Sequence, residues 1–530
     1  MKTKTKYLLS AFVLTMGFCF TSKAQGSGDI MTIFPGTSVS IASGTTLSAP
    51  EVNLKSTSTQ YACLLLNGTI GGSTIVNYDR FVNVVGTLAG NGGNDLVSFP
   101  VKATGDVTFN DLLNFSPDNG TTTNSDIIVN SPSVTSLFAF GHYNNESASF
   151  VNYDSIANSS TVLNRAVGYR TATYSGQTIR FTGTVSKTTE TVGITTNTNY
   201  WNLVGNPYTT YLDSQMFLAQ NASVLDENAV AIYGYNSGTN IGDGTIGNYT
   251  IINYLTNSAI NIAPGQGFFV ANDLGMASNQ LTFTTAMRTF SGTDDFILER
   301  NTDQNHRLRL KAEHSNANFA TEFYFNTQST LGLDPGYDAA LYSGSVSNLM
   351  LYSQLVENNL GRNLALQSLG LSDLNDVTIP LGLKTAQGFE VVFSIEDSTL
   401  PSEVLVYLED RQTNTFTLLN DNNYSFTAET AISGTGRFFL RIGNQTLSDI
   451  KQENSKVSLY ANQQTIFIKG LLLADSTVEV YDIQGRLVLN QKLKEGSDDN
   501  SIAATSLNTG IYIIHLKNEI QMQTKKVIIH

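Results

Sequence analysis

Apolar and polar residues alternate in short runs along almost the whole chain, and turn residues separate the runs. In residues 25–93, each run spans only a few positions before Gly, Asn or Ser interrupts it. Alternation with a period of two is typical of β-strands that bury one face. The spacing fits either a few rungs of a β-solenoid or an ordinary meander. The pattern alone does not choose between these two arrangements.

The middle of the chain repeats itself at a distance of about a hundred residues. The run DLVSFP at 95–100 matches NLVGNP at 202–207, and a helix-start signal follows each run. Further matched runs follow in the same order: 110–113 with 213–218, 137–143 with 232–235, 152–153 with 253–254, 167–169 with 267–269 and 179–181 with 281–283. A period of this length predicts two similar β domains, at 94–190 and 191–290, or two halves of one larger sandwich.

The last part of the chain divides into three segments. Residues 291–445 contain many short alternating runs with turn signals between them, which predicts an antiparallel β-sandwich. Residues 446–455 are polar and lack apolar periodicity, so they predict a linker. Residues 456–530 return to short alternating runs and predict a separate small β unit.

The first 24 residues differ from all that follows. Lys2, Lys4 and Lys6 form a basic front, the apolar run 8–20 comes next, and Ser22-Lys23-Ala24 provides a cleavage site of small residues. This order predicts a secretory signal peptide at 1–24. The apolar run is shorter than the roughly 20 residues that span a bilayer. No later stretch is long and apolar enough either, so we expect no membrane span in the mature chain.

Charged residues are scarce. They make up 14% of the chain, compared with about 25% in ordinary soluble proteins, and Thr, Ser, Asn and Gly take their place. Cleavage after residue 24 would remove four lysines and no acid, so the formal net charge would move from −14 to −18. Because an acidic chain repels phosphate backbones and anionic lipid, nucleic acid and bare membrane surfaces are poor partners.

The C-terminal unit carries three motifs in a fixed order. These are VYDIQGRLV at 480–488, the run TGIY at 509–512, and KKVII at 525–529. The candidate motif residues are Tyr481, Asp482, Gly485, Arg486, Gly510, Tyr512, Lys525 and Lys526. In order, spacing and position, this unit resembles the type A sorting domain of type IX secretion cargo. It ends in His530, where many members of that family end in Lys or Arg.

The resemblance implies a route out of the cell. Such cargo crosses the inner membrane by its signal peptide, and the type IX machinery then carries it through the outer membrane. The sorting domain is similar to a small Ig-like sandwich and is usually removed at the surface. The mature protein is then released or attached to a surface glycolipid. The middle also resembles uncharacterised secreted surface proteins of this class, through runs such as WNLVGNPY at 201–208 and GRFFLRIG at 436–443.

The motifs also have a direct physical interpretation. Asp482 and Gly485 stand where the strand VYD turns back into LVL, which predicts a hairpin. We expect Gly485 to be the turn residue with positive φ. We expect Gly510 to let the chain enter the next strand. These residues would then build the surface that a receptor contacts.

Signatures of catalysis are absent from the sequence. A catalytic nucleophile needs a neighbouring base. The chain has only five histidines, and two of them, His515 and His530, belong to the sorting domain. Neither a Gly-x-Ser-x-Gly elbow nor a His-Glu-x-x-His helix occurs. A glycosidase needs only two carboxylates, and Asp294, Asp295 and Glu299 are candidates in a stretch typical of a solvated loop. We therefore expect no enzyme activity.

Metal and thiol chemistry have weak support. Asp243, and Asp334 with Asp338, lie in glycine-containing loops of the kind that hold calcium in extracellular β domains. Their spacing matches no EF-hand, so calcium stays an open option without assigned ligands, and no other cofactor is expected. Cys63 lies in the apolar run YACLLL, which predicts a buried structural thiol.

Aromatic residues give the remaining functional hint. Trp201 is the only tryptophan and begins the second repeat. An exposed aromatic ring on a β surface would stack on a sugar, whereas a buried Trp201 would fill a sandwich core. Tyr233, Tyr235, Tyr249 and Tyr254 could line the same face. Trp201 is therefore a speculative ligand contact.

Together these patterns predict an all-β chain of several antiparallel sandwiches that ends in an Ig-like sorting domain. The expected partners are the type IX machinery and a surface glycolipid or extracellular glycan. The first functional hypothesis is a non-enzymatic adhesin or structural component at the cell surface. The alternatives are a carbohydrate-binding protein and a polysaccharide-degrading enzyme.

Overall fold

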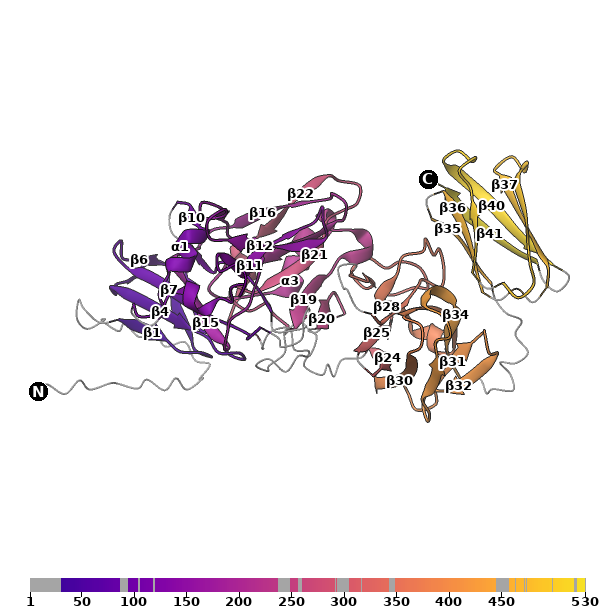
Figure 1. Cartoon of the computed structure of the whole chain (residues 1–530), viewed down its shortest axis with the longest axis horizontal. Coiled ribbons are helices and arrows are strands. Elements are labelled where there is room, and N and C mark those ends of the chain that lie inside the picture. Colours follow the sequence, from indigo (N-terminus) through magenta and orange to yellow (C-terminus); the bar gives the residue numbers. More distant parts are fainter. Residues whose placement is uncertain are drawn as a thin grey trace, which may run out of the picture. The chain divides into compact units, whose positions relative to one another are not determined.

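The computed structural model describes most of the chain between residues 30 and 529 (Figure 1). The undescribed residues are 1–29, 86–93, 103–104, 118–119, 237–247, 256–259, 291, 293–304, 316, 343–347, 445–456, 463, 471, 473, 498, 519–521 and 530. The predicted signal peptide and linker fall among them. The chain forms two compact units, with the second comprising residues 226–231, 253–255 and 302–530 and the first comprising the rest. Nearly all described elements are strands, which confirms the predicted all-β fold.

The first six strands stack as two rungs of a parallel β-solenoid. The first rung contains β1 (Met31–Ile33), β2 (Ser38–Ile41) and β3 (Thr46–Leu47), and the second contains β4 (Glu51–Lys55), β5 (Cys63–Leu66) and β6 (Thr69–Ile70). Each strand pairs in parallel with its counterpart in the other rung. β7 (Ile75–Val82) continues the stack on β4. The structure therefore has the solenoid and not the meander.

The two sequence repeats form two four-stranded sheets with the same strand order. In the first sheet the order is β12 (Ser149–Asp154), β11 (Leu137–Asn144), β14 (Tyr169–Thr171), β8 (Asp95–Val97). In the second it is β20 (Asn248–Ile252), β19 (Ile232–Asn236), β21 (Gly267–Ala271), β17 (Trp201–Gly205). Strands at equivalent places in the two sheets come from segments that were matched between the two sequence repeats. This agreement supports an internal duplication.

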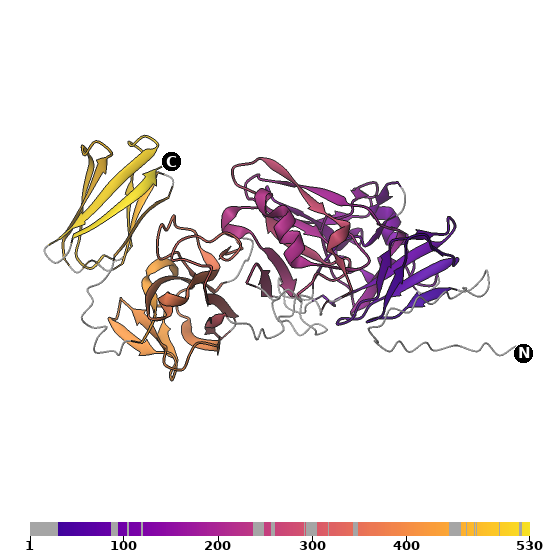
Figure 2. The same ribbon diagram turned by 180° about the vertical axis from the view of Figure 1, so that it is seen from behind.

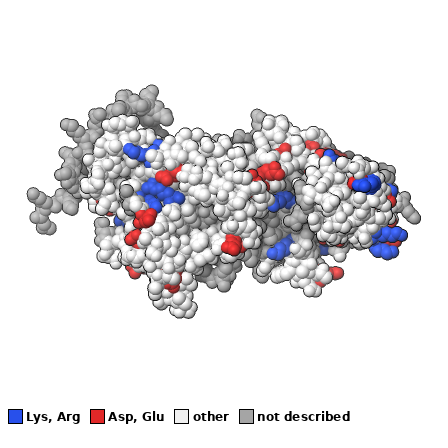
Figure 3. Space-filling view, turned by 90° about the horizontal axis from the view of Figure 1, so that it is seen from above, with Lys and Arg blue, Asp and Glu red and all other residues white. Residues whose placement is uncertain are grey.

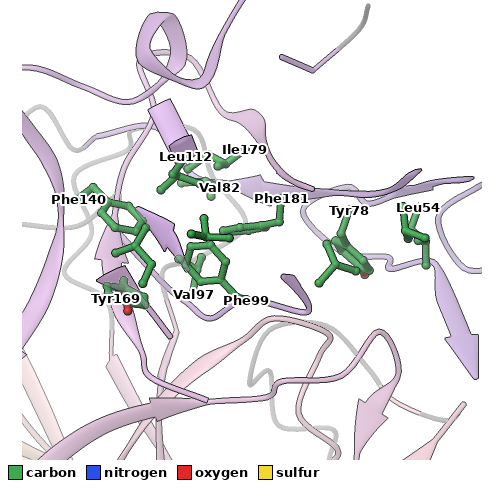
Figure 4. Close-up of a cluster of buried hydrophobic side chains, with 14 of the residues drawn as sticks. Leu54, Tyr78, Val82, Val97, Phe99, Leu112, Phe140, Tyr169, Ile179 and Phe181 are labelled. Atoms are coloured by element: carbon green, nitrogen blue, oxygen red, sulfur yellow. The ribbon is translucent and has the colours of Figure 1, made fainter. Parts of the chain in front are cut away.

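The N-terminal region and the first repeat share one sheet and one core. β15 (Gln177–Val185) of the repeat pairs with β7 and with β9 (Val101–Lys102), so the sheet runs β1-β4-β7-β15-β9. Figure 4 shows Leu54 and Tyr78 of the solenoid in the same buried cluster as Phe99, Phe140 and Phe181. The predicted boundary at residue 93 therefore does not separate two cores.

A buried ion pair crosses this sheet. The carboxylate of Asp79 in β7 accepts hydrogen bonds of 2.7 and 2.8 Å from Nε and Nη2 of Arg180 in β15. Nζ of Lys55 lies 2.5 Å from the same carboxylate. Asp79 has no exposed surface. Because a buried charge is tolerated only when it is paired, these contacts favour the observed register of β7 against β15.

Short helices begin where the sequence predicts them. α1 (Phe109–Asn114) has a capping box between Thr108 and Asp111, and α3 (Ser214–Asn221) is capped by Asp213. Both helix-start predictions are confirmed. The other short elements are α2 (Asn124–Ile127), η1 (Ala222–Val224), η2 (Glu227–Ala229), η3 (Thr285–Met287), and the strand pairs β10 (Val107–Thr108) with β13 (Val162–Leu163), β16 (Glu190–Thr195) with β22 (Ser278–Phe283), and β18 (Tyr211–Leu212) with β23 (Arg288–Thr289).

An eleven-stranded sheet forms between residues 306 and 443. Its order is β32 (Thr415–Leu418), β31 (Leu405–Asp410), β34 (Ile432–Gly443), β29 (Asp376–Thr385), β27 (Met350–Ser353), β28 (Leu364–Gly370), β25 (Ala317–Asn326), β24 (His306–His314), β30 (Glu390–Ser398), β33 (Tyr424–Thr427), with β26 (Ala339–Ala340) beside β28 and η4 (Leu371–Leu374) after it. β30 and β34 are far apart in this strand order, but the ring centroids of Phe393 in β30 and Phe438 in β34 lie 5.0 Å apart in the same core cluster. The sheet therefore folds over a single core.

Residues 457–529 form a sandwich of two sheets with its own core. One sheet contains β35 (Ser458–Asn462), β36 (Thr465–Lys469) and β39 (Asp499–Ala503). The other has the order β38 (Leu487–Leu493), β37 (Ser476–Asp482), β40 (Gly510–Lys517), β41 (Met522–Ile529). Figure 2 shows the two sheets facing each other in yellow. The core cluster that the structure describes for this sandwich lies entirely within 457–529, so the sandwich has a core of its own.

The low charge of the sequence is visible on the molecular surface. In the view of Figure 3, Lys, Arg, Asp and Glu side chains form small separate groups on an otherwise uncharged face. Many charged groups are instead used in pairs, such as Arg309 with Glu396 and Arg437 with Asp410. Such a surface offers polar Thr, Ser and Asn side chains for contact, as in many extracellular β domains.

Candidate functional site

The hairpin between β37 and β38 is organised by Asp482. Its Oδ1 accepts hydrogen bonds from the backbone N–H groups of Gln484 (2.9 Å) and Arg486 (3.0 Å). The N–H of Gly485 donates to the Asp482 carbonyl at 3.0 Å, and Gly485 has φ of +79°. The predicted hairpin and the positive φ of Gly485 are confirmed. Only Gly adopts this backbone without strain.

Asp482 also fixes the side chain of Arg486. Arg486 Nε lies 2.7 Å from Asp482 Oδ2, while 74% of the Arg486 side chain is exposed. The hydrogen bond from the Arg486 backbone is the main cause that lowers the pKa of Asp482, so its carboxylate stays charged. The hairpin therefore presents a fixed guanidinium to solvent.

Gly510 and Tyr512 lie at the start of β40. Tyr512 is buried, and its hydroxyl donates to the Asn508 carbonyl at 2.8 Å, which ties the preceding turn to the strand. Gly510 has ordinary φ, and a methyl group on its Cα would lie 3.7 Å from the nearest neighbouring atom. The backbone therefore does not require Gly at 510, although the sequence led us to expect that it would.

Tyr481 lies on the outer face of the four-stranded sheet. Its hydroxyl donates to Glu479 Oε2 at 2.7 Å, which raises the pKa of Tyr481. Its ring centroid lies 5.0 Å from that of His515. Glu479 also pairs with Lys517 at 2.5 Å. Tyr481 is thus held in place by a small polar network on the sheet surface.

Lys525 and Lys526 lie side by side in β41 but on opposite faces. Lys526 is exposed and faces Ile513 across the sheet, whereas Lys525 is half-buried and faces Ile514. Within the described part of the chain, neither ammonium group pairs with an acid. Both charges are therefore available on the edge strand of the sheet.

An apolar surface connects these motif residues. It consists of half-buried or exposed side chains on neighbouring strands and is called the outer strip here: Tyr481, Leu487, Ile511, Ile513 and Ile528. Leu487 and Ile513 both lie opposite Tyr481, and Ile511 lies opposite Ile528. The solvent face of an antiparallel sheet is ordinarily polar. A strip of this kind is a candidate docking surface.

The sequence analysis singled out only Tyr481 of these five as a site residue, although the motif runs at 480–488, 509–512 and 525–529 also contain Leu487, Ile511 and Ile528. The signal that would have found Ile511 and Ile513 is the uninterrupted apolar run Ile511–Ile514 in β40. Tyr512 and Ile514 face the core, so Ile511 and Ile513 must face outward, because successive strand residues point to opposite sides. A strand with two apolar faces in a small sandwich is unusual.

Trp201 is not a ligand contact. The residue lies in β17 with no exposed surface, and its ring packs edge-to-face on Tyr233 at 4.7 Å. A sugar would have no access to it, so the speculative assignment is wrong. Of the tyrosines predicted to line the same face, Tyr235 and Tyr249 are neighbours at 5.4 Å. Tyr233 is buried, and Tyr254 instead packs on Tyr337.

The acidic candidates have structural uses or lie outside the described residues. Asp338 is buried, and its Oδ1 accepts hydrogen bonds from the N–H (2.7 Å) and hydroxyl (3.1 Å) of Ser368. Burial raises the pKa of Asp338 to about 7. The Asp334 carboxylate accepts from Thr330. Asp243, Asp294, Asp295 and Glu299 lie outside the described residues.

Other reactive groups are packed into the fold. Cys63 is buried as predicted, and burial raises its thiol pKa to about 11. Nδ1 of His142 lies 3.1 Å from the Tyr153 hydroxyl, and desolvation lowers the pKa of His142. His314 stacks on Phe389 at 4.3 Å. The described ranges contain no cluster of three or more His, Cys, Asp or Glu side chains that could hold a metal ion.

These features define an exported, nearly all-β protein with a C-terminal sorting module. The profile of the secretion system C-terminal sorting domain matches residues 460–530. The chain belongs to the family described as a domain of unknown function, DUF8693, whose profile matches residues 119–442. It is therefore a type IX secretion cargo that is delivered to the cell surface or released.

Other comparisons add little. No curated protein matches the chain. A solved structure titled "Biofilm associated protein - BSP domain" is similar at 8% identity, over 65% of this chain and 97% of that chain, with a TM-score of 0.14. At that TM-score the likeness carries no argument. Among the helices that the structure describes, none has the length and apolarity to cross a membrane.

Proposed function

We propose that this protein is a non-enzymatic adhesin or structural component of the outer cell surface. The observation that carries the proposal is the complete sorting sandwich at residues 457–529, because a chain delivered outside the cell acts there. The rest of the described chain consists of β units with polar, weakly charged surfaces. Such units suit contact with other surfaces.

The use of ionisable side chains supports a non-enzymatic role. In the described part of the eleven-stranded sheet, Glu409 pairs with Arg411 (2.9 Å) and with Arg441 (2.8 Å). In the first unit, Asp79 pairs with Arg180. An active site instead needs carboxylates or bases that are held toward a substrate. Groups that are saturated by partners inside the fold serve stability.

We also infer that the type IX machinery docks on the outer strip. The strip joins the motif residue Tyr481 to Ile511 and Ile528. The exposed Lys526 and the ion pair between Arg486 and Asp482 border it. An apolar centre with a charged rim is the usual anatomy of a protein–protein interface. After passage, release from the cell or attachment to a surface glycolipid would leave the β units outside.

Deletion of the gene is expected to reduce attachment of cells to a solid surface or to each other by several-fold, with growth unchanged. The full chain, supplied in trans, should restore attachment. A chain that ends at residue 456 should not restore it, because its β units would stay inside the cell. The measurement is crystal-violet staining of attached cells.

Two results would contradict the adhesin proposal. One is normal attachment in the deletion strain. The other is release of reducing sugar from a polysaccharide by the purified mature protein, which would favour the degradative enzyme instead. Surface labelling of the complemented strain controls for expression and delivery.

A further inference from the structure

Two pairs of aromatic side chains occupy equivalent places in the two repeat sheets. Tyr143 faces Phe150 across the β11–β12 hairpin, and Tyr235 faces Tyr249 across the β19–β20 hairpin. All four rings are half-buried, in contrast to the fully buried Phe140 and Tyr233 of the same strands. The duplicated sheets therefore each contribute one partly exposed aromatic pair.

The two pairs meet over one buried ring. Phe269 of β21 lies 4.9 Å from Tyr143, 6.1 Å from Phe150 and 6.0 Å from Tyr249. The contacts with Tyr143 and Phe150 are edge-to-face, which is a favourable geometry for aromatic rings. Phe269 thus packs beneath the half-buried rings and contacts residues of both repeats at this place.

Arg170 of β14 completes the group. Its guanidinium lies 4.4 Å above the centre of the Phe150 ring, and Nη2 donates to Oδ1 of the exposed Asn152 at 2.8 Å. Desolvation lowers the pKa of Arg170, and the nearby hydroxyls of Tyr235 and Tyr249 oppose this shift. The half-buried aromatic pairs together with Arg170 and Asn152 are called the aromatic rim here.

The charge of Arg170 is not balanced by an acid. Among the residues that the structure describes, no carboxylate pairs with it. By contrast, Arg165 and Arg180 of the same unit each pair with an acid, and Arg288 donates to two backbone carbonyls. A guanidinium has five N–H donors in a planar fork, and one of them is used by Asn152. The other donors match a carboxylate, which Arg binds in a bidentate way.

Ordinary packing between two sheets does not account for this arrangement. Packing explains the buried Phe269, but it would favour an apolar residue at 170 over a partly desolvated guanidinium without a carboxylate, which is costly to bury. Aromatic faces beside an amide and an arginine are suited to a sugar ring that carries a carboxylate. The apolar face of the sugar stacks on a ring, and its polar groups reach Arg170 and Asn152.

We propose that the aromatic rim binds an acidic polysaccharide, with a uronate carboxylate on Arg170 and a sugar ring stacked on the tyrosines. This inference rests on the proposed surface role, since it names the class of ligand that the adhesin would hold. Without the four lysines of residues 1–24, the net charge moves from −14 to −18. This charge repels polyanions at long range, so non-specific retention of such a polymer is disfavoured. Binding would have to come from a local site.

The test uses the purified full mature chain and two polymers, a polyuronate such as polygalacturonate and a neutral β-glucan, in affinity electrophoresis. We expect the polyuronate to retard the protein and the glucan not to. Arg170→Gln should weaken polyuronate binding at least about tenfold, since a charge-assisted bidentate pair is lost. Tyr249→Ala should weaken it by roughly tenfold through lost stacking. Arg170→Lys should weaken it less than Arg170→Gln.

Tyr174→Ala is the matched control, because Tyr174 is 49% exposed in the first repeat but lies outside the rim. Circular dichroism of each variant shows whether the fold is kept. Equal retardation by both polymers, retardation by neither, or unchanged binding of both folded rim variants would overturn the inference. If the deletion strain attaches poorly but the pure protein binds neither polymer, then polysaccharide binding by the aromatic rim is refuted. The adhesin proposal would still hold.

Discussion

Replacing Leu487, Ile511 and Ile528 together by Thr is expected to reduce export of the protein at least about tenfold and to leave the sorting sandwich folded. The three side chains are 50%, 41% and 43% exposed. Covering the exposed half of such a side chain contributes about 1 kcal/mol. The triple variant should therefore lose about 3 kcal/mol of docking free energy, or roughly 150-fold in affinity.

Thr is chosen because it has high strand propensity and, like Ile, is branched at Cβ. The measurement is the ratio of extracellular to periplasmic protein in a host with the type IX machinery. The matched control replaces Ile75, Val134 and Ile156 by Thr, since these are 52%, 48% and 78% exposed outside the sorting sandwich. Normal export of the strip variant, or an equal loss of export in the control variant, would show that the type IX machinery does not recognise the outer strip.

Trp201→Ala is expected to destabilise the first unit by about 3–5 kcal/mol, the usual cost of truncating a fully buried large aromatic side chain. Trp201 has no exposed surface and packs on Tyr233 and Tyr200. Domains of this size lose about 2–4 °C of melting temperature per kcal/mol. The transition of the first unit should therefore fall by roughly 10 °C, and that of the sorting sandwich should stay in place.

Calorimetry is the suitable measurement, because Trp201 is the only tryptophan and its removal abolishes the tryptophan fluorescence signal. Phe34→Ala serves as the comparison, since Phe34 is 64% exposed and surface substitutions change stability by only about 0.5 kcal/mol. If Trp201→Ala and Phe34→Ala lower the melting temperature of the first unit equally, then the stability of this unit does not depend on the buried Trp201 side chain.

Local features were predictable from the sequence. Asp482 and Gly485 determine the hairpin through bonds that span only four residues, and capping residues such as Asp213 determine where α3 begins. The fold class followed from alternation and turn residues. The sorting domain was recognisable because its motifs lie in one short segment.

Features that depend on distant pairing were not predictable. Alternation shows that a segment is a strand but not whether its partner runs parallel, so the solenoid of β1 to β7 was left open. The pairing of β7 with β15 brings together Asp79 and Arg180, which are 101 residues apart in the sequence. Burial of Trp201 and the meeting of Tyr143 with Phe269 likewise depend on which sheets pack together.

We expect the sandwich at 457–529 to fold alone and to be sufficient for passage through the outer membrane. Its core draws only on its own residues. The most direct measurement fuses residues 457–530 to the end of a stable periplasmic reporter in a host that has the type IX machinery. The fused reporter is expected to appear at the cell surface or in the medium. A folded reporter that stays in the periplasm, while the full chain is exported from the same cells, would contradict it.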